Sequence, residues 1–330
     1  MTLQQMIALF RTEAFDNSNP PLFADTEIIT WLNEAQVEAA IRMKLLRENT
    51  NPLFCKYDIR ESVMDYPVDS RMFQIEYASL IFQGANGMLP YVLAVTSAEE
   101  LDGVRPFWRT LPFRPTGIIV YDTSFRTDAL PNSNFTISVE GYRLPNATMD
   151  QQPVPEVLAT STITLTGGAA GSVNSIQVNG IEALGVALPY DVSLTQTATD
   201  IAAQINTWQN RFVASALGAV ITLTDLPTSG SAHNGWTVAV TSTTITTTAT
   251  ALAGGVDAVV TSPEINQIHH RFLVKWAMHR GYERPDAESY DPDKATRALK
   301  EFEDYFGIRP DASLRKRYNA SKPHRNLAYG

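Results

Sequence analysis

One stretch decides how the first part of the chain folds, Asp25-Thr-Glu-Ile-Ile-Thr-Trp-Leu-Asn-Glu-Ala-Gln-Val-Glu-Ala-Ala-Ile-Arg42. Its apolar positions and those just beyond it follow helical spacing: Ile28, Leu32, Ala35, Ala39 and Leu46. Asp25 is the expected N-cap, because its carboxylate can accept hydrogen bonds from the free amides of the first turn. The pattern predicts an amphipathic helix of about six turns that ends before Asn51-Pro52.

Further helices are expected at both ends of the chain. Residues 2–15 place four apolar side chains on one face: Leu3, Met6, Ile7 and Phe10. In the second half, Ser262 is the expected N-cap of a helix with Pro263 at its first position, where the missing amide costs nothing. The last helix is expected to start at Asp291-Pro292 and to stop at Gly307.

Between these helices the sequence changes to strands and turns. Cys55, Tyr57 and Ile59 alternate with polar residues, and prolines interrupt the stretch up to residue 144. The segment Phe135–Arg143 places Phe135, Ile137 and Val139 on one face. It is therefore predicted to be a half-buried strand.

A compositional border follows at residue 157. From there to residue 263 the chain has no Lys and one Arg, Arg211. Asn179-Gly180 predicts a hairpin turn, because both residues readily take a positive φ. Residues 197–208 are predicted to form a short helix. We expect a mostly β domain of roughly 100 residues, set into a loop of the surrounding domain.

The two ends of this segment have a matching pattern. Pro155-Glu-Val157 precedes it and Pro263-Glu-Ile265 follows it, so the chain could run from one to the other without losing an element. We therefore treat the segment as an insertion in a domain built from both ends of the chain.

Composition limits the classes of function. The chain has 330 residues and a formal charge of -9, which argues against a surface that grips nucleic acid all over. The single cysteine, Cys55, excludes an internal disulfide and is expected to be a buried apolar residue. The N-terminus lacks the pattern of a signal peptide, and no apolar run is long enough for a membrane span.

The sequence predicts no catalytic, cofactor or metal site. His269 and His270 are adjacent, so on a helix they point about 100° apart and cannot share an ion as an i, i+4 pair can. With His279 they are expected at a helix surface or an interface. The acids between Asp286 and Asp293 lack the spacing of a calcium loop and are expected to form turns and caps.

The last residues, 308–330, are basic and lack apolar periodicity. They hold one acid, Asp311, against these cations: Arg309, Arg315, Lys316, Arg317, Lys322 and Arg325. Leu314, Tyr318, Leu327 and Tyr329 supply apolar anchors. A solvated, flexible terminus is the simplest alternative. We expect instead an extended arm that orders on binding a neighbour, with protein contact favoured over DNA contact.

Several segments, in this order, resemble the head-to-tail adaptor proteins of short-tailed phages. They are Leu22–Arg42, Ser97–Asp102 with Arg105-Pro-Phe-Trp108, Val139–Pro145, and a last segment that runs from His270–Ala277 to Gly307. No catalytic signature is among them, and residues 157–262 depart from the family pattern. That segment is similar to the immunoglobulin-like modules that phage particle proteins carry as insertions.

The resemblance implies an α+β fold with a helical body and β loops, formed by residues 1–156 and 263–307. The inserted β domain is then 157–262 and the arm 308–330. Copies would form a ring, of about twelve subunits, between portal and tail. DNA would pass through the channel without sequence-specific binding, and the arm would bind the portal protein.

The resemblance also implies partners and a location. The partners are the chain's own copies, the portal and the tail nozzle or tail fibre proteins, with no membrane and no cofactor. The location is the head-tail junction of the virion, and before assembly the chain would be in the host cytoplasm. Two alternatives stay open. One is a particle-surface protein that binds glycan or another partner through the β domain, where the large aromatics are Tyr190, Trp208 and Trp236. The other is an enzyme such as a cell-wall hydrolase.

Overall fold

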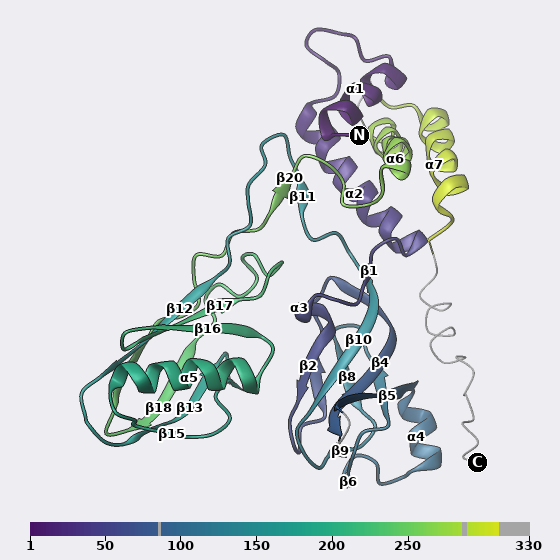
Figure 1. Ribbon diagram of the computed structural model, residues 1–330. Coiled ribbons are helices and arrows are strands. Elements are labelled where there is room, and N and C mark those ends of the chain that lie inside the picture. The colour runs from purple at the N-terminus through teal and green to yellow at the C-terminus, as the bar shows by residue number, and fades with distance from the viewer. Residues whose placement is uncertain (85–86, 286–288, 310–330) are drawn as a thin grey trace. The chain divides into compact units, whose positions relative to one another are not determined.

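The computed structural model describes residues 1–84, 87–285 and 289–309 of the chain. Its contacts divide the chain into two units (Figure 1). The first unit contains residues 1–50, 59–152 and the chain from 260 onward, and the second contains residues 51–58 and 153–259. Helices and strands both occur, so the predicted α+β class is confirmed.

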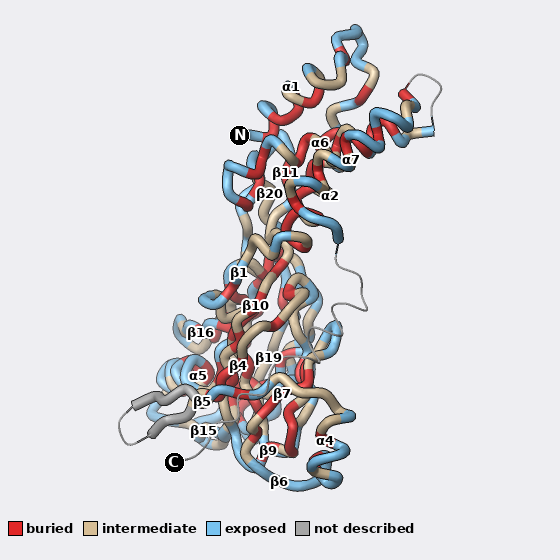
Figure 2. Tube along the Cα trace, turned by 90° about the vertical axis from the view of Figure 1, so that its right-hand side faces the viewer, coloured by how far each residue is buried: buried red, intermediate tan, exposed pale blue. Residues whose placement is uncertain are grey.

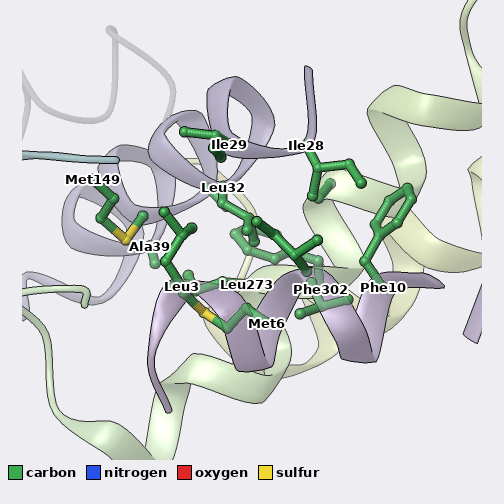
Figure 3. Packing of buried hydrophobic residues seen from close by; sticks show 14 of the residues in the cluster. Leu3, Met6, Phe10, Ile28, Ile29, Leu32, Ala39, Met149, Leu273 and Phe302 are labelled. Atoms are coloured by element: carbon green, nitrogen blue, oxygen red, sulfur yellow. The ribbon is translucent and has the colours of Figure 1, made fainter. Parts of the chain in front are cut away.

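Helices from both ends of the chain share one core in the first unit. They are α1 (Leu3–Ala14), α2 (Asp25–Met43), α6 (His270–Tyr282) and α7 (Pro292–Phe306), with a short 3-10 turn, η1 (Gln267–His269), before α6. Helix α6 packs against the other three helices. Phe10, Leu32, Leu273 and Phe302 meet in the core (Figure 3), and buried positions recur along α2, α6 and α7 (Figure 2).

The predicted face of α1 and both predicted ends of α7 are confirmed, whereas the predicted N-cap of α2 is wrong. Helix α1 buries the predicted face of residues 3–10, and Asp291 caps α7 by accepting a hydrogen bond from the Lys294 amide. Gly307 follows α7 with a positive φ of 81°. The N-cap of α2 is Ala24, because Arg11 binds the Asp25 carboxylate instead and holds its pKa below the usual value.

Helix α2 is also shorter than predicted. It ends at Met43, where Lys44 takes a left-handed conformation with a φ of 54°. The chain then joins the sheet as β1 (Arg47–Glu48), which pairs with Gly141 and Tyr142. Tertiary pairing therefore ends the helix before the predicted stop at Asn51-Pro52.

A sheet forms the rest of the first unit. Its strand order is β1-β10-β4-β5-β7-β8-β3, with antiparallel neighbours except for the parallel pair β5 and β7. The strands are β3 (Asp65–Pro67), β4 (Met72–Gly84), β5 (Gly87–Thr96), β7 (Gly117–Val120), β8 (Ser124–Thr127) and β10 (Phe135–Arg143). Helix α4 (Ala98–Val104) follows β5, and the short strands β6 (Pro112–Phe113) and β9 (Leu130–Pro131) pair in parallel.

Strand β10 confirms the predicted segment 135–143. Ile137 and Val139 are fully buried, and the same face continues to Gly141 and Arg143. Gly141 lies at an irregularity of the register, where a Cβ atom would come within 2.2 Å of the Gln74 carbonyl oxygen. A glycine is therefore needed for the close approach of β10 and β4.

Arg143, at the end of β10, is buried between two carboxylates from distant parts of the chain. Its Nε donates to Glu48 at 2.9 Å and its Nη2 donates to Glu264 at 2.6 Å. The second Glu264 oxygen accepts the Asn146 amide at 2.8 Å. Because Glu48 follows α2 and Glu264 precedes α6, Arg143 joins both ends of the chain to the sheet.

This network overturns the predicted start of the third helix. Ser262 and Pro263 are not helical, and the 3-10 turn before α6 begins after Asn266, whose side chain accepts the Ile268 amide. The Glu264 amide donates to the Gln36 side chain at 2.7 Å while its carboxylate binds Arg143. These contacts hold residues 262–266 outside the helix, despite a favourable N-cap and proline.

The second unit contains two sheets and a helix. One sheet has the order β16-β17-β12-β19, and in the other β13 pairs with β14, β15 and β18. The elements are β12 (Thr160–Thr166), β13 (Ser172–Val178), β14 (Ile181–Glu182), β15 (Leu188–Pro189), α5 (Leu194–Trp208), β16 (Phe212–Leu217), β17 (Val220–Asp225), β18 (Val238–Thr243) and β19 (Thr246–Ala249). At the borders lie α3 (Pro52–Cys55), β2 (Lys56–Ile59), β11 (Thr148–Met149) and β20 (Val259–Val260).

Local signals in the second unit are confirmed. Asn179 and Gly180 have φ values of 49° and 79° and join β13 to β14, as the predicted hairpin requires. Helix α5 starts at Leu194, earlier than predicted, because the Ser193 side chain accepts the Gln196 amide. Cys55 is buried.

The Arg143 network gives a first prediction. Replacing Arg143 with Met leaves Glu48 and Glu264 without their shared cation, so we expect a loss of at least about 3 kcal/mol in the free energy of unfolding. The control is Arg47→Met on the adjacent strand. Arg47 pairs with Glu140, but its side chain is 62% exposed. We expect that change to stay within about 0.5 kcal/mol. Urea denaturation followed by circular dichroism measures both, and equal losses would contradict the role of Arg143.

Tyr66 on β3 gives a second prediction. Its hydroxyl donates to the Val63 carbonyl at 2.9 Å, and burial raises its pKa to about 12 from 10.0. Since the folded pKa is raised, the stabilisation is complete below pH 10 and is lost as the pH rises towards 12. In a titration followed by phenolate absorbance, Tyr66→Phe should remove one group that ionises near pH 12. Loss of a group that ionises near pH 10 would disprove the assignment.

Candidate functional site

The first candidate surface is the point where the C-terminal segment leaves α7. The Arg309 guanidinium donates to Glu38 on α2 at 2.9 Å. Arg42, one turn further along α2, donates to the second Glu38 oxygen at 3.2 Å and to the Gly307 carbonyl at 3.0 Å. These bonds fix the start of the segment on the side of α2.

Arg42 is the centre of this cluster. Its side chain is only 5% exposed and lies over the rings of Trp276 and Phe302, at 5.5 and 5.1 Å from their centroids. A further hydrogen bond joins it to Glu303 at 3.3 Å. A guanidinium that is stacked and paired in this way is well ordered, so α2, α6 and α7 present one rigid base for the segment.

Of the arm residues predicted from the sequence, the structure places Arg309 alone. The others lie outside the described residues: Leu314, Arg315, Lys316, Arg317, Tyr318, Lys322, Arg325 and Tyr329. Their role as a partner-binding arm therefore stays a prediction.

The second candidate surface was not predicted from the sequence. Four apolar side chains within ten residues are exposed: Val104 by 73%, Phe107 by 76%, Leu111 by 56% and Phe113 by 50%. We call these four residues the tip surface. Single exposed apolar residues are ordinary, but a group of this kind on one short segment is typical of a protein interface.

The segment beneath the tip surface is firmly anchored. Trp108 is 2% exposed and donates its indole N–H to Asp102 at 2.9 Å, and Arg109 stacks on its ring at 4.3 Å. Arg105 donates to the buried Asp128 carboxylate at 2.7 Å. Phe107 and Trp108 are neighbours in sequence with opposite burial. The exposure of Phe107 is therefore built into an ordered segment, which costs little further entropy on binding.

His269, His270 and His279 are buried at contacts between elements of the first unit, so the prediction of a helix-surface position is wrong. His270 is 2% exposed, and its ring lies between Met1 and the Ile265 carbonyl, each at 2.9 Å. His279 contacts the Ala295 carbonyl at 3.1 Å, and His269 contacts the Tyr305 hydroxyl at the same distance. These side chains join α6 to α7 and to the N-terminus.

Metal chemistry has no candidate centre in the described part of the chain. Among those residues, no three His, Cys, Asp or Glu side chains lie close enough together to hold an ion. Asp291 is the cap of α7, while Asp286 and Glu288 lie outside the described residues. Within the same ranges, no helix is long and apolar enough to cross a membrane.

The aromatics considered for glycan binding, Tyr190, Trp208 and Trp236, do not form an exposed platform. Tyr190 and Trp236 are half-buried and pack against the core of that unit. Trp208 is half-buried as well, and a Cβ atom at Gly185 would come within 2.1 Å of its ring. Sugar-binding sites usually expose such rings, so this arrangement gives little support for glycan binding.

Comparison with known proteins identifies a family. The family model described as SU10 adaptor protein matches residues 1–165, which is half of the chain. The matched range includes α1, α2, the sheet of the first unit and the tip surface, whereas α6 and α7 lie outside it. No curated protein matches the chain.

Proposed function

The chain belongs to the SU10 adaptor protein family, which makes it a structural head-to-tail adaptor of a phage particle, and we propose that its copies form a ring between portal and tail. We propose a ring of about twelve subunits around the DNA channel, which is the assembly that the resemblance to head-to-tail adaptors implies. Adaptors of this kind interact with portal and tail components and reside in the virion. The family is structural, which favours a role without catalysis.

The family match carries the proposal, and the helical core limits which surfaces can join the subunits. The apolar faces of α1, α2, α6 and α7 pack against one another within the chain, so they are not available to join subunits. Contacts between particle proteins must therefore use other surfaces. The tip surface is the best candidate, because it is apolar, exposed and ordered in the isolated chain.

The charge around the tip surface indicates an apolar partner surface. Arg105 and Arg109 are already paired with Asp128 and Asp102 within the chain. They need no acids from a partner. Two exposed phenylalanine rings among aliphatic neighbours are typical of the buried centre of a permanent interface. We propose that the tip surface contacts a neighbouring subunit or a tail component.

The C-terminal segment has a different proposed partner. Residues 308–330 are rich in Arg and Lys, and the cluster around Arg42 fixes where they leave α7. We propose that they extend from this base and bind the portal protein. The chain would not bind the DNA that passes through the channel tightly, because its net charge of -9 repels phosphate.

The β domain is proposed as an insertion at 157–262, in a body formed by 1–156 and 263–307. Supporting this, the Asp150 amide donates to the Val260 carbonyl at 3.0 Å, so the chain leaves and returns at one place. Within the second unit, Val154 pairs with Val259 and Val157 with Val256. An excursion whose ends are paired can be added to a domain with little disturbance.

A charge placed on the tip surface tests its proposed role. Phe107 is mostly exposed in the isolated chain, so Phe107→Asp should leave the free energy of unfolding within about 0.5 kcal/mol of the unmodified chain. In the particle, losing a central phenylalanine contact should cost at least about 2 kcal/mol per interface. We expect at least about tenfold fewer tail-bearing particles when the variant replaces the normal chain during infection, counted by electron microscopy.

The matched control is Leu217→Asp in the second unit, where the leucine is 87% exposed. It adds the same charge to an exposed apolar position and should assemble normally. If Phe107→Asp particles acquire tails as often as the control, the tip surface is not the interface.

A further inference from the structure

A groove runs along the side of α2 close to the point where the described chain ends. It is lined by Thr30, Asn33, Glu34, Val37, Glu38 and Trp276, and its volume is about 460 Å³. We call it the α2 groove. Val37 and Trp276 supply its apolar surface, and Glu34 and Glu38 supply acids. A groove of this composition fits an apolar side chain that is followed by cations.

The chain itself leads to this groove. Arg309 binds Glu38 at 2.9 Å, so the last described residue already contacts a residue that lines it. The Glu38 side chain of this ion pair is largely buried, at 12% exposed. The C-terminal segment thus begins at one end of the α2 groove.

The sequence beyond Arg309 has the matching order of side chains. Leu314 is the first large apolar residue after Ile308, and Arg315-Lys-Arg317 follows it directly. From Glu38 back to Thr30, eight residues of helix span about 12 Å. The five residues from Arg309 to Leu314 reach up to about 17 Å when extended. Leu314 can therefore reach Val37 and Trp276, with the cations beyond it towards Glu34.

We propose that in the free subunit the α2 groove holds the chain's own C-terminal segment, with Leu314 in the groove. Glu34 is available to the cations that follow. Its present partner is Arg280 at 3.1 Å, and both side chains are about 40% exposed, so this ion pair is weak and can be shared. The segment would bind as an extended strand across the side of a helix.

Docking within one chain has a consequence for assembly, which rests on the proposed function. An arm stored on its own subunit is unavailable to other free subunits, and the portal must offer a better site to release it. The apparent affinity for the portal is then the intrinsic affinity multiplied by the fraction of arms that are free. Storage of this kind would keep adaptors apart until they meet the portal.

Disulfide trapping in the full chain tests the proposal. The probe carries Val37→Cys and Leu314→Cys, while the native Cys55 is buried and cannot compete. Docking would hold the two thiols side by side and raise their effective concentration above that of a pair which shares the tether alone, so mild oxidation should link them at least about tenfold faster. Non-reducing gel electrophoresis separates an internally linked monomer from a linked dimer.

The control pair is Arg271→Cys with Leu314→Cys, because Arg271 lies on α6 away from the groove and its side chain is 69% exposed. A fast internal link in the Val37 pair alone supports the proposal. Linked dimers would mean that the groove takes the segment of another copy, and equal rates for both pairs would mean an unattached segment. Either of these results overturns the proposal.

A second pair protects the test against a folding defect. Thr30→Cys with Tyr318→Cys places the thiols at the far end of the α2 groove and avoids the partly buried Val37. It should also form an internal link, and failure of both pairs in folded chains would count against docking. Because only the isolated chain is used, the outcome does not depend on whether the chain forms a ring.

Discussion

The ion pairs of Arg143 are the constraint on which the first unit depends. The chain leaves this unit at residue 152 and returns at residue 260, so its last helices must find their place after a long excursion. Arg143 binds Glu264 just after the return and Glu48 just after α2, and Gln36 on α2 accepts the Glu264 amide. A buried arginine with one carboxylate from each side of the excursion specifies a single way to join them. Such an arrangement contributes more to specificity than to net stability, because desolvation offsets much of the attraction.

Because the apolar faces of the four helices are buried against one another, the chain can bind partners only through its remaining surfaces. Two of them differ in chemistry. The tip surface is apolar and its nearby charges are paired internally, which suits a permanent contact. The C-terminal segment is basic and starts from a rigid cluster around Arg42, which suits an arm that changes partner. An adaptor needs both kinds of contact, since it must stay bound in the particle and must also wait for its partners before assembly.

Local signals in the sequence predicted much of the fold, and long-range contacts account for what it missed. The Asn179-Gly180 turn and the Asp291 cap depend on neighbours within a few residues, and both are as predicted. Asp25 and Ser262 have the same capping chemistry, but distant partners override it: Arg11 binds Asp25, and the contacts of Glu264 keep Ser262 outside a helix. The tip surface was missed because Phe107 and Trp108 look alike in sequence, and only tertiary contacts decide which of them is buried.

A cryo-electron microscopy reconstruction of the particle's portal end tests the central claim most directly. The account predicts a closed ring of this chain below the portal, in which each copy has α1, α2, α6 and α7 packed as one core and a basic segment that extends towards the portal. The claim would be contradicted by a reconstruction that resolves the portal and tail without this chain between them. It would be contradicted equally by density in which α1 and α2 separate from α6 and α7.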